Sequence, residues 1–261
     1  MRITVFLILS TLFNTLFADS LILPMRERAV AIDQIIDERI ATVLPGLMER
    51  SDIDIWVIIS REYNEDPIIK TFLPSTWQTA RRRTILLISN PGKGQPLETL
   101  AVARYAVGDT FEKAWDKELH GDQWQRLAQL IEERDPKRIG INYSDTFALA
   151  DGVTRTEFEL FMEALAPKFQ ERVVSAENLA VGWLETRSQQ EITIYQQICR
   201  IAHEILAAGL TSEVIQPGIT TTNDVAWWYR DRIRELKLTT WFHPSVSIQR
   251  ETSPALDAKA S

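Results

Sequence analysis

Residues 84–105, TILLISNPGKGQPLETLAVARY, have the pattern of two strands joined by a turn within this 261-residue chain. The two ends of this stretch, residues 84–89 and 97–105, are short runs rich in apolar residues and bounded by turn residues, which is typical of strands. The Asn-Pro-Gly-Lys-Gly sequence at 90–94 predicts a hairpin between them. Three further short runs predict additional strands, at residues 54–60, 138–142 and 172–174.

Segments with helical spacing alternate with these strands. Apolar residues recur at three- and four-residue steps in residues 26–50, 121–134 and 154–166, as they do on one face of a helix. Strands that alternate with helices indicate a layered α/β fold. We therefore expect an N-terminal α/β domain over residues 19–185.

Two capping boxes predict the helices of a second part. Ser188 and Glu191 have the S-x-x-E spacing in which a hydroxyl and a carboxylate satisfy each other's backbone N–H groups, so a helix should begin there and run to about Ala208. The sequence Thr221-Thr222-Asn223-Asp224, directly after the Pro217-Gly218 turn, predicts the start of another helix.

The last residues of the given sequence show weaker secondary-structure patterns. Residues 241–249 predict an extended segment, and residues 251–261 predict a loop or tail because they hold few large apolar residues. We expect residues 186–250 to form the opening helices and first strand of a second domain. So few residues cannot close a hydrophobic core of their own.

The first eighteen residues differ from the rest of the chain. Arg2 supplies a positive start, residues 3–17 form an almost uncharged apolar run, and Ala18 is a small residue that suits a cleavage site. The run is shorter than the roughly 20 apolar residues that a membrane-spanning helix needs, which favours a cleaved secretory signal peptide over an uncleaved anchor. We expect an exported protein, in a bacterial periplasm, with no stable membrane insertion after cleavage.

Charge and cysteine content exclude several classes of function. The chain has 29 Lys and Arg against 36 Asp and Glu, a net charge of -7, which argues against nucleic acid or an anionic membrane as the main partner. Cys199 is the only cysteine, so the chain can form no intrachain disulfide and no thiolate metal site. Its helical, partly apolar surroundings favour inert packing over reactivity.

Catalytic motifs with fixed spacing are missing from the sequence. It contains no G-x-G-x-x-G, no G-x-x-x-x-G-K-[ST] and no G-x-S-x-G. His203-Glu204 begins like the zinc-binding H-E-x-x-H motif, but Ala207 replaces the second histidine. His120 lies in a polar loop. His243 is the candidate substrate-binding residue, because it precedes Pro244 at the start of the extended segment. The sequence indicates no catalytic residue and no metal ligand.

Two local clusters have an ordinary and a functional interpretation. Arg81-Arg82-Arg83 precedes a predicted strand, which favours a solvated sheet edge or a salt-bridging patch over an anion site. Trp227 and Trp228 lie about 100° apart on a predicted helix, so at least one should face the core. The other could form an interface.

Several stretches, taken as a series, resemble the Xaa-Pro aminopeptidase and creatinase branch of the pita-bread metallopeptidases. They are residues 132–142 (EERDPKRIGIN), residues 181–187 (VGWLETR), Glu191, residues 217–225 (PGITTTNDV) and residues 241–250 (WFHPSVSIQR). The resemblance implies a creatinase-type N-terminal α/β domain with a mixed sheet, followed here by an incomplete pita-bread (α+β) domain.

The resemblance also implies an activity and a cofactor. Those enzymes hydrolyse peptides at the N-terminus with two divalent metal ions, Mn, Co or Zn, held by two Asp, one His and two Glu. This chain is expected to stop before the first of these ligands, so none is transferred to it, and Asp257 is left unassigned. The implied partners are a peptide substrate and, through the N-terminal domain, a second copy of the chain.

Two interpretations remain open. In the first, the chain is the N-terminal portion of an exported Xaa-Pro aminopeptidase-like metallopeptidase and is inactive by itself. In the second, it is a non-catalytic periplasmic binding or dimerisation module derived from the N-terminal domain.

Overall fold

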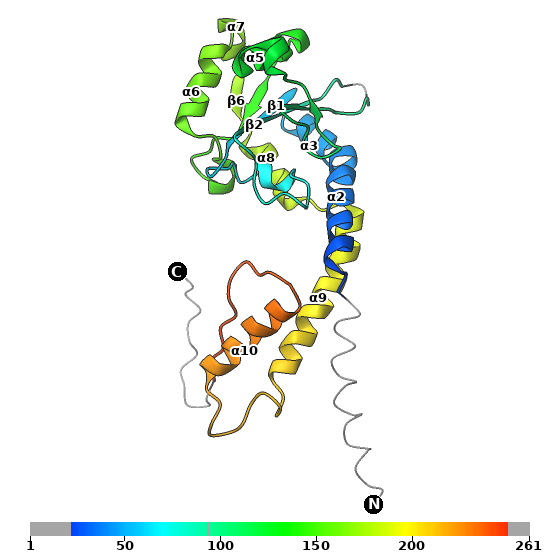
Figure 1. Cartoon of the computed structure of the whole chain (residues 1–261), viewed down its shortest axis with the longest axis vertical. Coiled ribbons are helices and arrows are strands. Elements are labelled where there is room, and N and C mark those ends of the chain that lie inside the picture. Colours follow the sequence, from blue (N-terminus) through cyan, green and yellow to red (C-terminus); the bar gives the residue numbers. More distant parts are fainter. Residues whose placement is uncertain (1–21, 93, 250–261) are drawn as a thin grey trace, which may run out of the picture. The chain divides into compact units, whose positions relative to one another are not determined.

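The computed structural model of the chain describes residues 22–92 and 94–249 (Figure 1). Contacts divide them into an α/β domain, Met25–Ile192, and a helical unit made of residues 193–249 together with residues 22–24. The expected signal peptide at residues 1–18 and the tail at residues 251–261 lie outside the described residues. Across the described part of the chain, no helix is long and apolar enough to cross a membrane.

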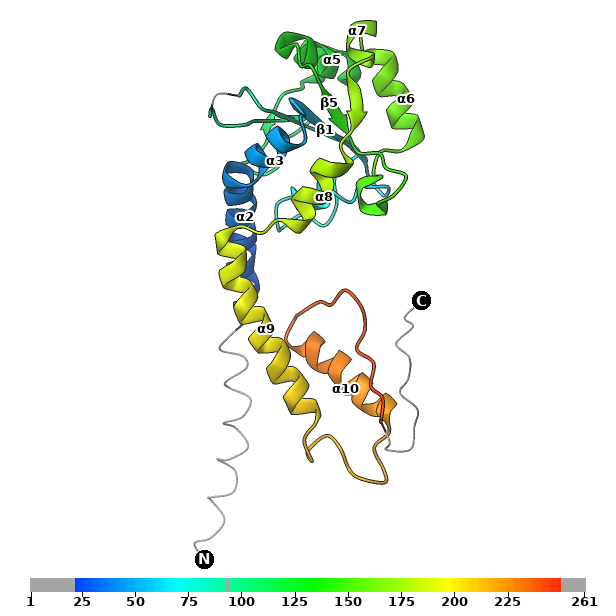
Figure 2. The same cartoon turned by 180° about the vertical axis from the view of Figure 1, so that it is seen from behind.

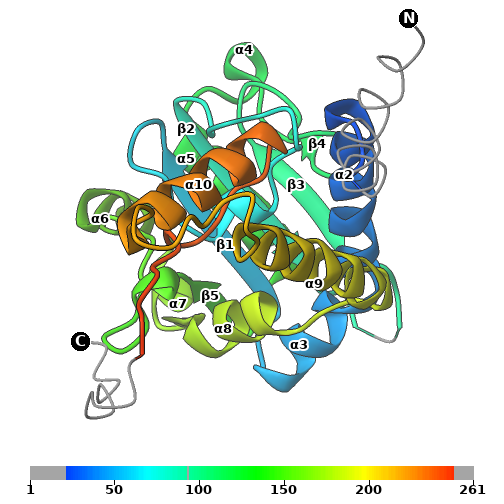
Figure 3. The same cartoon turned by 90° about the horizontal axis from the view of Figure 1, so that it is seen from below.

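One six-stranded sheet organises the α/β domain. Its strand order is β4-β3-β2-β1-β5-β6, and Figure 3 shows the neighbouring strands β3, β2 and β1 from below. Strand β1 pairs antiparallel with β2 and parallel with β5, so the sheet is mixed. The predicted α/β class with a mixed sheet is confirmed. The strands are β1 (Ile55–Arg61), β2 (Arg83–Ser89), β3 (Glu98–Val102), β4 (Glu112–Lys113), β5 (Ile139–Ile141) and β6 (Val173–Ser175).

Helices cover both faces of this sheet (Figures 1 and 2). On one face lie α2 (Met25–Thr42), α3 (Leu44–Arg50) and α8 (Glu177–Glu185). On the other face lie α5 (Gln123–Arg134), α6 (Arg155–Ala164) and α7 (Pro167–Gln170). The short helices are α4 (Lys117–His120), η1 (Ile69–Thr71) and η2 (Ala148–Ala150).

Strand β1 shows why the sequence forms three layers. Its side chains alternate between two buried clusters, with Trp56 and Ile58 in the first and Ile55, Val57 and Ile59 in the second. A strand that is buried on both faces must be apolar at successive positions, as residues 55–59 are.

The predicted hairpin joins β2 to β3. The two strands pair antiparallel from Ser89 opposite Glu98 to Ile85 opposite Val102. Gly92 in the connection has a φ of +72°, a left-handed conformation that residues with a side chain rarely adopt. The turn residues named from the sequence therefore set this hairpin.

One predicted helix is divided in the structure, and another is shorter than predicted. The helix expected over residues 26–50 ends at Thr42, and a new helix begins at Leu44. Pro45 lies in the first turn of the new helix, where a backbone N–H would have no intrahelical acceptor, so the proline is tolerated there. The helix expected over residues 154–166 ends at Ala164. Residues 165 and 166 are extended there, because Pro167 disfavours helical geometry in the residue before it.

The helical unit is built by α9 (Gln189–Gly209), whose first turn belongs to the α/β domain, and α10 (Thr222–Glu235). Ile201 and Ile205 of α9 pack with Val225 and Tyr229 of α10 in a small buried cluster. Gly209 allows this approach, since a Cβ at that position would lie 2.3 Å from the Tyr229 ring.

Both capping boxes form as predicted. Ser188 N donates to the Glu191 carboxylate at 2.8 Å, and Glu191 N donates to Ser188 Oγ at 3.2 Å, at the start of α9. Thr221 and Asp224 make the same reciprocal pair at the start of α10. The Asp224 carboxyl has a lowered pKa because the Thr221 hydroxyl and backbone N–H both donate to it.

The expected strand at residues 241–249 is not formed. Residues 239–249 have no regular secondary structure, and the helical unit contains no strand within the part that the structure describes. A strand needs a neighbouring strand for its backbone hydrogen bonds, and described residues of this unit offer none.

Candidate functional site

The three histidines lie in different settings. His243, the candidate substrate-binding residue, is exposed in the irregular segment of the helical unit, and His203 is exposed on α9. His120 ends α4 in the α/β domain, and its Nδ1 accepts a hydrogen bond from Asp116 N at 2.9 Å. Across residues 22–92 and 94–249, no group of three or more His, Cys, Asp or Glu side chains is placed to hold a metal ion.

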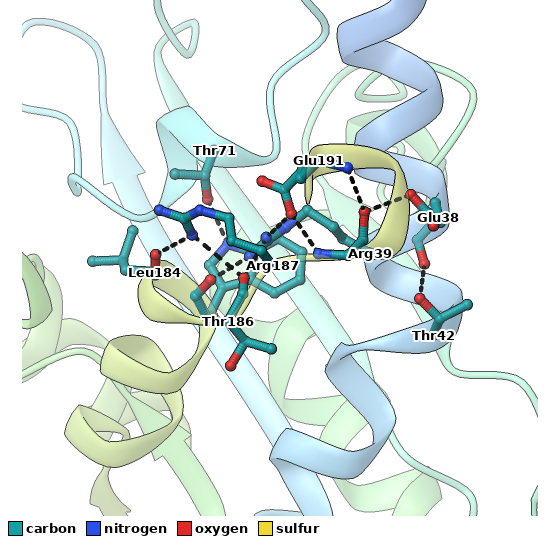
Figure 4. Close-up of polar contacts among 10 residues, drawn as sticks. Glu38, Arg39, Thr42, Thr71, Leu184, Thr186, Arg187 and Glu191 are labelled. Carbon is teal, nitrogen blue, oxygen red and sulfur yellow. Dashed lines mark hydrogen bonds and ion pairs between the residues drawn. The ribbon is translucent and has the colours of Figure 1, made fainter. Parts of the chain in front are cut away.

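A buried arginine connects the first helix of the α/β domain to the segment that precedes the helical unit. Arg39 of α2 is only 6% exposed, and its guanidinium donates to the carbonyl oxygens of Trp183 and Thr186 and to the Glu191 carboxylate (Figure 4). A buried charge costs free energy unless it is paired and hydrogen-bonded, and Arg39 meets both conditions. We call Arg39 and these three partners the Arg39 junction.

The junction extends through aromatic and polar contacts. The Arg39 guanidinium lies 4.2 Å from the centroid of the Trp183 ring, which stacks on Phe72 at 4.6 Å. Trp183 Nε1 donates to Thr71 Oγ1 at 2.7 Å, and Ser188 Oγ donates to the Glu38 carboxylate at 2.6 Å. Helices α2 and α8 and the start of α9 are therefore fixed to one another within Met25–Ile192.

Sequence reasoning did not identify Arg39. Its partners Trp183, Thr186 and Glu191 belong to the stretches that carry the resemblance, but Arg39 lies far earlier in the chain, at a sequence separation of 152 from Glu191. A charged residue on the buried side of an amphipathic helix was the available signal, because such a residue needs a partner.

A cavity of about 680 Å³ lies at the end of the sheet where β1 ends and β2 begins. We call it the basic cavity because cationic side chains dominate its lining. They are Arg61, Arg81, Arg82, Arg83, Arg104 and Lys117. Glu62 and Asp122 supply the carboxylates of the lining. The Arg81-Arg82-Arg83 cluster is thus brought together with cations from three other segments.

Buried Glu157 of α6 holds two of these arginines. Arg83 donates to both of its carboxylate oxygens, at 2.6 and 3.1 Å, and Arg61 Nε lies 3.6 Å from Oε1. Arg83 also lies over the Trp124 ring, 4.8 Å from its centroid. The predicted salt-bridging role therefore holds for Arg83.

A second buried carboxylate lies inside the α/β domain, next to the end of β5. Asp66 accepts hydrogen bonds from Asn142 Nδ2 at 2.9 Å and from Ile68 N at 2.7 Å, and Asn142 Oδ1 accepts from Trp56 Nε1 at 2.7 Å. Burial raises the pKa of the Asp66 carboxyl from its usual 3.8 to about 6, and the Asn142 hydrogen bond partly opposes this.

The tryptophan pair on α10 is divided between core and surface, as predicted. Trp228 packs against the cluster of the helical unit, whereas Trp227 is 53% exposed. Arg230 lies over the Trp227 ring, 4.5 Å from its centroid.

No protein-family model and no curated protein matches this sequence. A solved structure, the Xaa-Pro dipeptidase from Bacillus anthracis, is similar over 77% of this chain and 49% of that chain, with 17% sequence identity and a TM-score of 0.44. The chain thus spans about half the length of that protein. Values this low assign the chain to no family.

Proposed function

We propose that the chain is the N-terminal α/β domain, with the opening helices of a pita-bread domain, of an exported metallopeptidase similar to Xaa-Pro aminopeptidases. In this proposal, residues 22–249 shape the substrate side and the assembly of the peptidase and do not carry out hydrolysis. The peptide substrate, the periplasmic location and pairing with a second copy belong to the same proposal.

The Arg39 junction is the observation that carries it. Trp183, Thr186 and Glu191 lie in the stretches on which the resemblance rests, and Arg39 binds all three. They join an α/β domain to a capped helix that leads into a second, helical unit, which is the order of parts that the resemblance implies.

The metal ions of such a peptidase do not fit the residues that the structure describes. Those residues contain no suitable group of His, Cys, Asp and Glu side chains. Two divalent ions need several carboxylate or imidazole ligands converging on one place. We therefore assign no hydrolytic step to residues 22–249.

An aminopeptidase assay tests the proposal. The chain, supplied with Mn²⁺ and an X-Pro tripeptide, should release no N-terminal residue. The nucleotides after codon 261 should be read in parallel. If they continue the gene, the longer product should cleave the same peptide and lose this activity with a chelator. Turnover by residues 19–261 alone, or a continuation without Asp, His and Glu ligands, would contradict the proposal.

Exposed apolar residues on α9 favour the second candidate function, a non-catalytic dimerisation module. Tyr195, Ile198 and Leu206 are 62%, 53% and 50% exposed, and their spacing places them along one side of the helix. Exposed apolar stripes of this kind occur at protein interfaces. If residues 19–261 fold cooperatively and sediment as a dimer without peptidase activity, this candidate gains. An aggregated, partly unfolded product would count against it.

A further inference from the structure

We propose that the basic cavity binds a small organic anion that carries at least two negative charges. This inference is independent of the proposed peptidase function, since it uses only the α/β domain. The cavity gathers cationic side chains from the end of β1, from the segment before β2, from the segment after β3 and from α4.

Strand pairing alone creates a repulsive arrangement at this end of the sheet. Arg61 and Arg83 lie directly opposite each other on antiparallel β1 and β2. Like charges in this position repel. The buried Glu157 carboxylate contacts both arginines and offsets that repulsion. These two arginines are thus accounted for within the fold.

The other four cations are not accounted for in the same way. Arg81, Arg82, Arg104 and Lys117 form no ion pair with any residue in the described ranges. Arginine keeps its charge at every relevant pH. An acidic protein with a net charge of -7 therefore holds a local concentration of positive charge.

The two carboxylates of the lining offset only part of the charge of its six cationic side chains, and their hydrogen bonds are made with backbone N–H groups. Glu62 accepts a hydrogen bond from Arg82 N at 2.9 Å. Asp122 accepts from Trp124 N at 2.8 Å and from Gln125 N at 3.1 Å, as the N-cap of α5. Mutual repulsion among the remaining cations would be relieved by an anionic ligand.

Backbone geometry at the rim is also unusual. Tyr63 and Arg82 have positive φ values of +69° and +53°, which residues with a side chain seldom adopt. Glu62 N donates a hydrogen bond of 2.6 Å to Arg82 O, which joins the segment after β1 to the segment before β2. Conformations of this kind are concentrated at ligand sites.

The dimensions and lining of the cavity indicate the class of ligand. A volume of about 680 Å³ lies within the range of small-molecule sites and is small for a folded partner. Guanidinium groups bind carboxylates and phosphates through paired hydrogen bonds. Tyr63, Tyr105 and Trp115 add aromatic surface for the organic part of the ligand.

Calorimetric titration of the chain with glucose 6-phosphate and with citrate tests this proposal and distinguishes phosphate from carboxylate chemistry. We expect saturable binding of at least one of them at 1:1 stoichiometry, weaker at 150 mM than at 20 mM NaCl. The double variant Arg81→Ala/Arg104→Ala should weaken binding at least about tenfold, because charge-assisted hydrogen bonds are lost.

Arg138→Ala is the matched control. Arg138 is an exposed arginine that precedes β5, beside Ile55 at the opposite end of β1 from the cavity, and its removal should leave binding unchanged within about twofold. Lys117→Gln provides a second test on α4, with a loss of about threefold or more. Circular dichroism should show that all variants are folded.

Three outcomes would overturn the proposal. The first is the absence of saturable binding of both anions. The second is an equal loss of affinity in Arg138→Ala, which would indicate unspecific attraction. The third is tighter binding of a deca-glutamate peptide than of either small anion, which would make the surface a peptide site.

Discussion

The Arg39 guanidinium lies 4.2 Å above the Trp183 ring and donates to the Trp183 carbonyl oxygen. One residue of α2 thereby holds both the side chain and the backbone of a residue near the end of α8. The Arg39 side chain keeps 8% of its surface exposed, and that of its acidic partner Glu191 keeps 21%. The junction is thus largely desolvated, and removal of one partner should have a large effect.

Arg39→Ala should lower the free energy of unfolding of the chain by about 3 kcal/mol, because it leaves a largely buried carboxylate and two carbonyl groups without their donor. Urea denaturation followed by circular dichroism measures this. Arg187→Ala removes an exposed arginine of the same segment and should cost no more than about 0.5 kcal/mol. Equal urea midpoints for Arg39→Ala and Arg187→Ala would show that the Arg39 junction does not stabilise the fold.

Glu157→Gln should destabilise the α/β domain by about 3 kcal/mol, since it leaves Arg61 and Arg83 opposite each other without a counter-charge. Thermal unfolding at low and high salt measures this, and salt should restore part of the loss. Glu159→Gln removes the exposed partner of Arg155 one turn away and should cost about 0.5 kcal/mol or less. If Glu157→Gln lowered the thermal stability no more than this control, the pairing of Glu157 with Arg61 and Arg83 would not stabilise the domain.

The contribution of Asp66 to stability should fall as pH rises from about 4 to about 6. The folded pKa of Asp66, about 6, lies above the usual 3.8, so the folded state binds more protons than the unfolded state in this window. The contribution of Asp66 is fully present below 3.8 and is lost as pH rises through 6. The shift corresponds to about 3 kcal/mol at most.

The variant Asp66→Asn should remove this part of the pH dependence, because the amide does not titrate. Urea denaturation at pH 4, 5, 6 and 7 measures it, with the exposed Asp109→Asn as the control that keeps the wild-type profile. A profile for Asp66→Asn as steep as that of the wild type would show that another group is responsible.

A dimer formed through α9 should dissociate when its exposed apolar side is charged. The double variant Tyr195→Glu/Ile198→Glu should sediment as a monomer at concentrations where the wild type is dimeric, since it places like charges in the interface. Leu119→Glu, at another exposed apolar residue, should leave the dimer intact. A dimer that persists in the double variant would place the interface elsewhere.

Much of the fold could be predicted from short-range patterns. The hairpin follows from the turn residues at 90–94, and the capping boxes follow from pairs of residues three positions apart, such as Ser188 and Glu191. Such interactions are local and need no knowledge of the rest of the chain. Where a proline directly follows a helical pattern, as Pro167 does, the pattern alone overestimated the length of the helix.

The strand expected at residues 241–249 shows the limit of local patterns. An apolar, extended-looking segment becomes a strand only when another strand supplies hydrogen-bond partners, and described residues of the helical unit supply none. His243 gains no defined surroundings for the same reason and lies exposed.

The α/β class, the hairpin and the two helix starts could be predicted from local residue patterns, because each depends on residues close together along the chain. Which charged side chains pair with one another depends on tertiary packing. It placed Arg39 against residues 183–191, buried Glu157 beneath Arg61 and Arg83, and gathered the cations of the basic cavity from four segments. Charge pairing between distant segments depends on how the layers pack, and the periodicity of the sequence does not show which segments pack together.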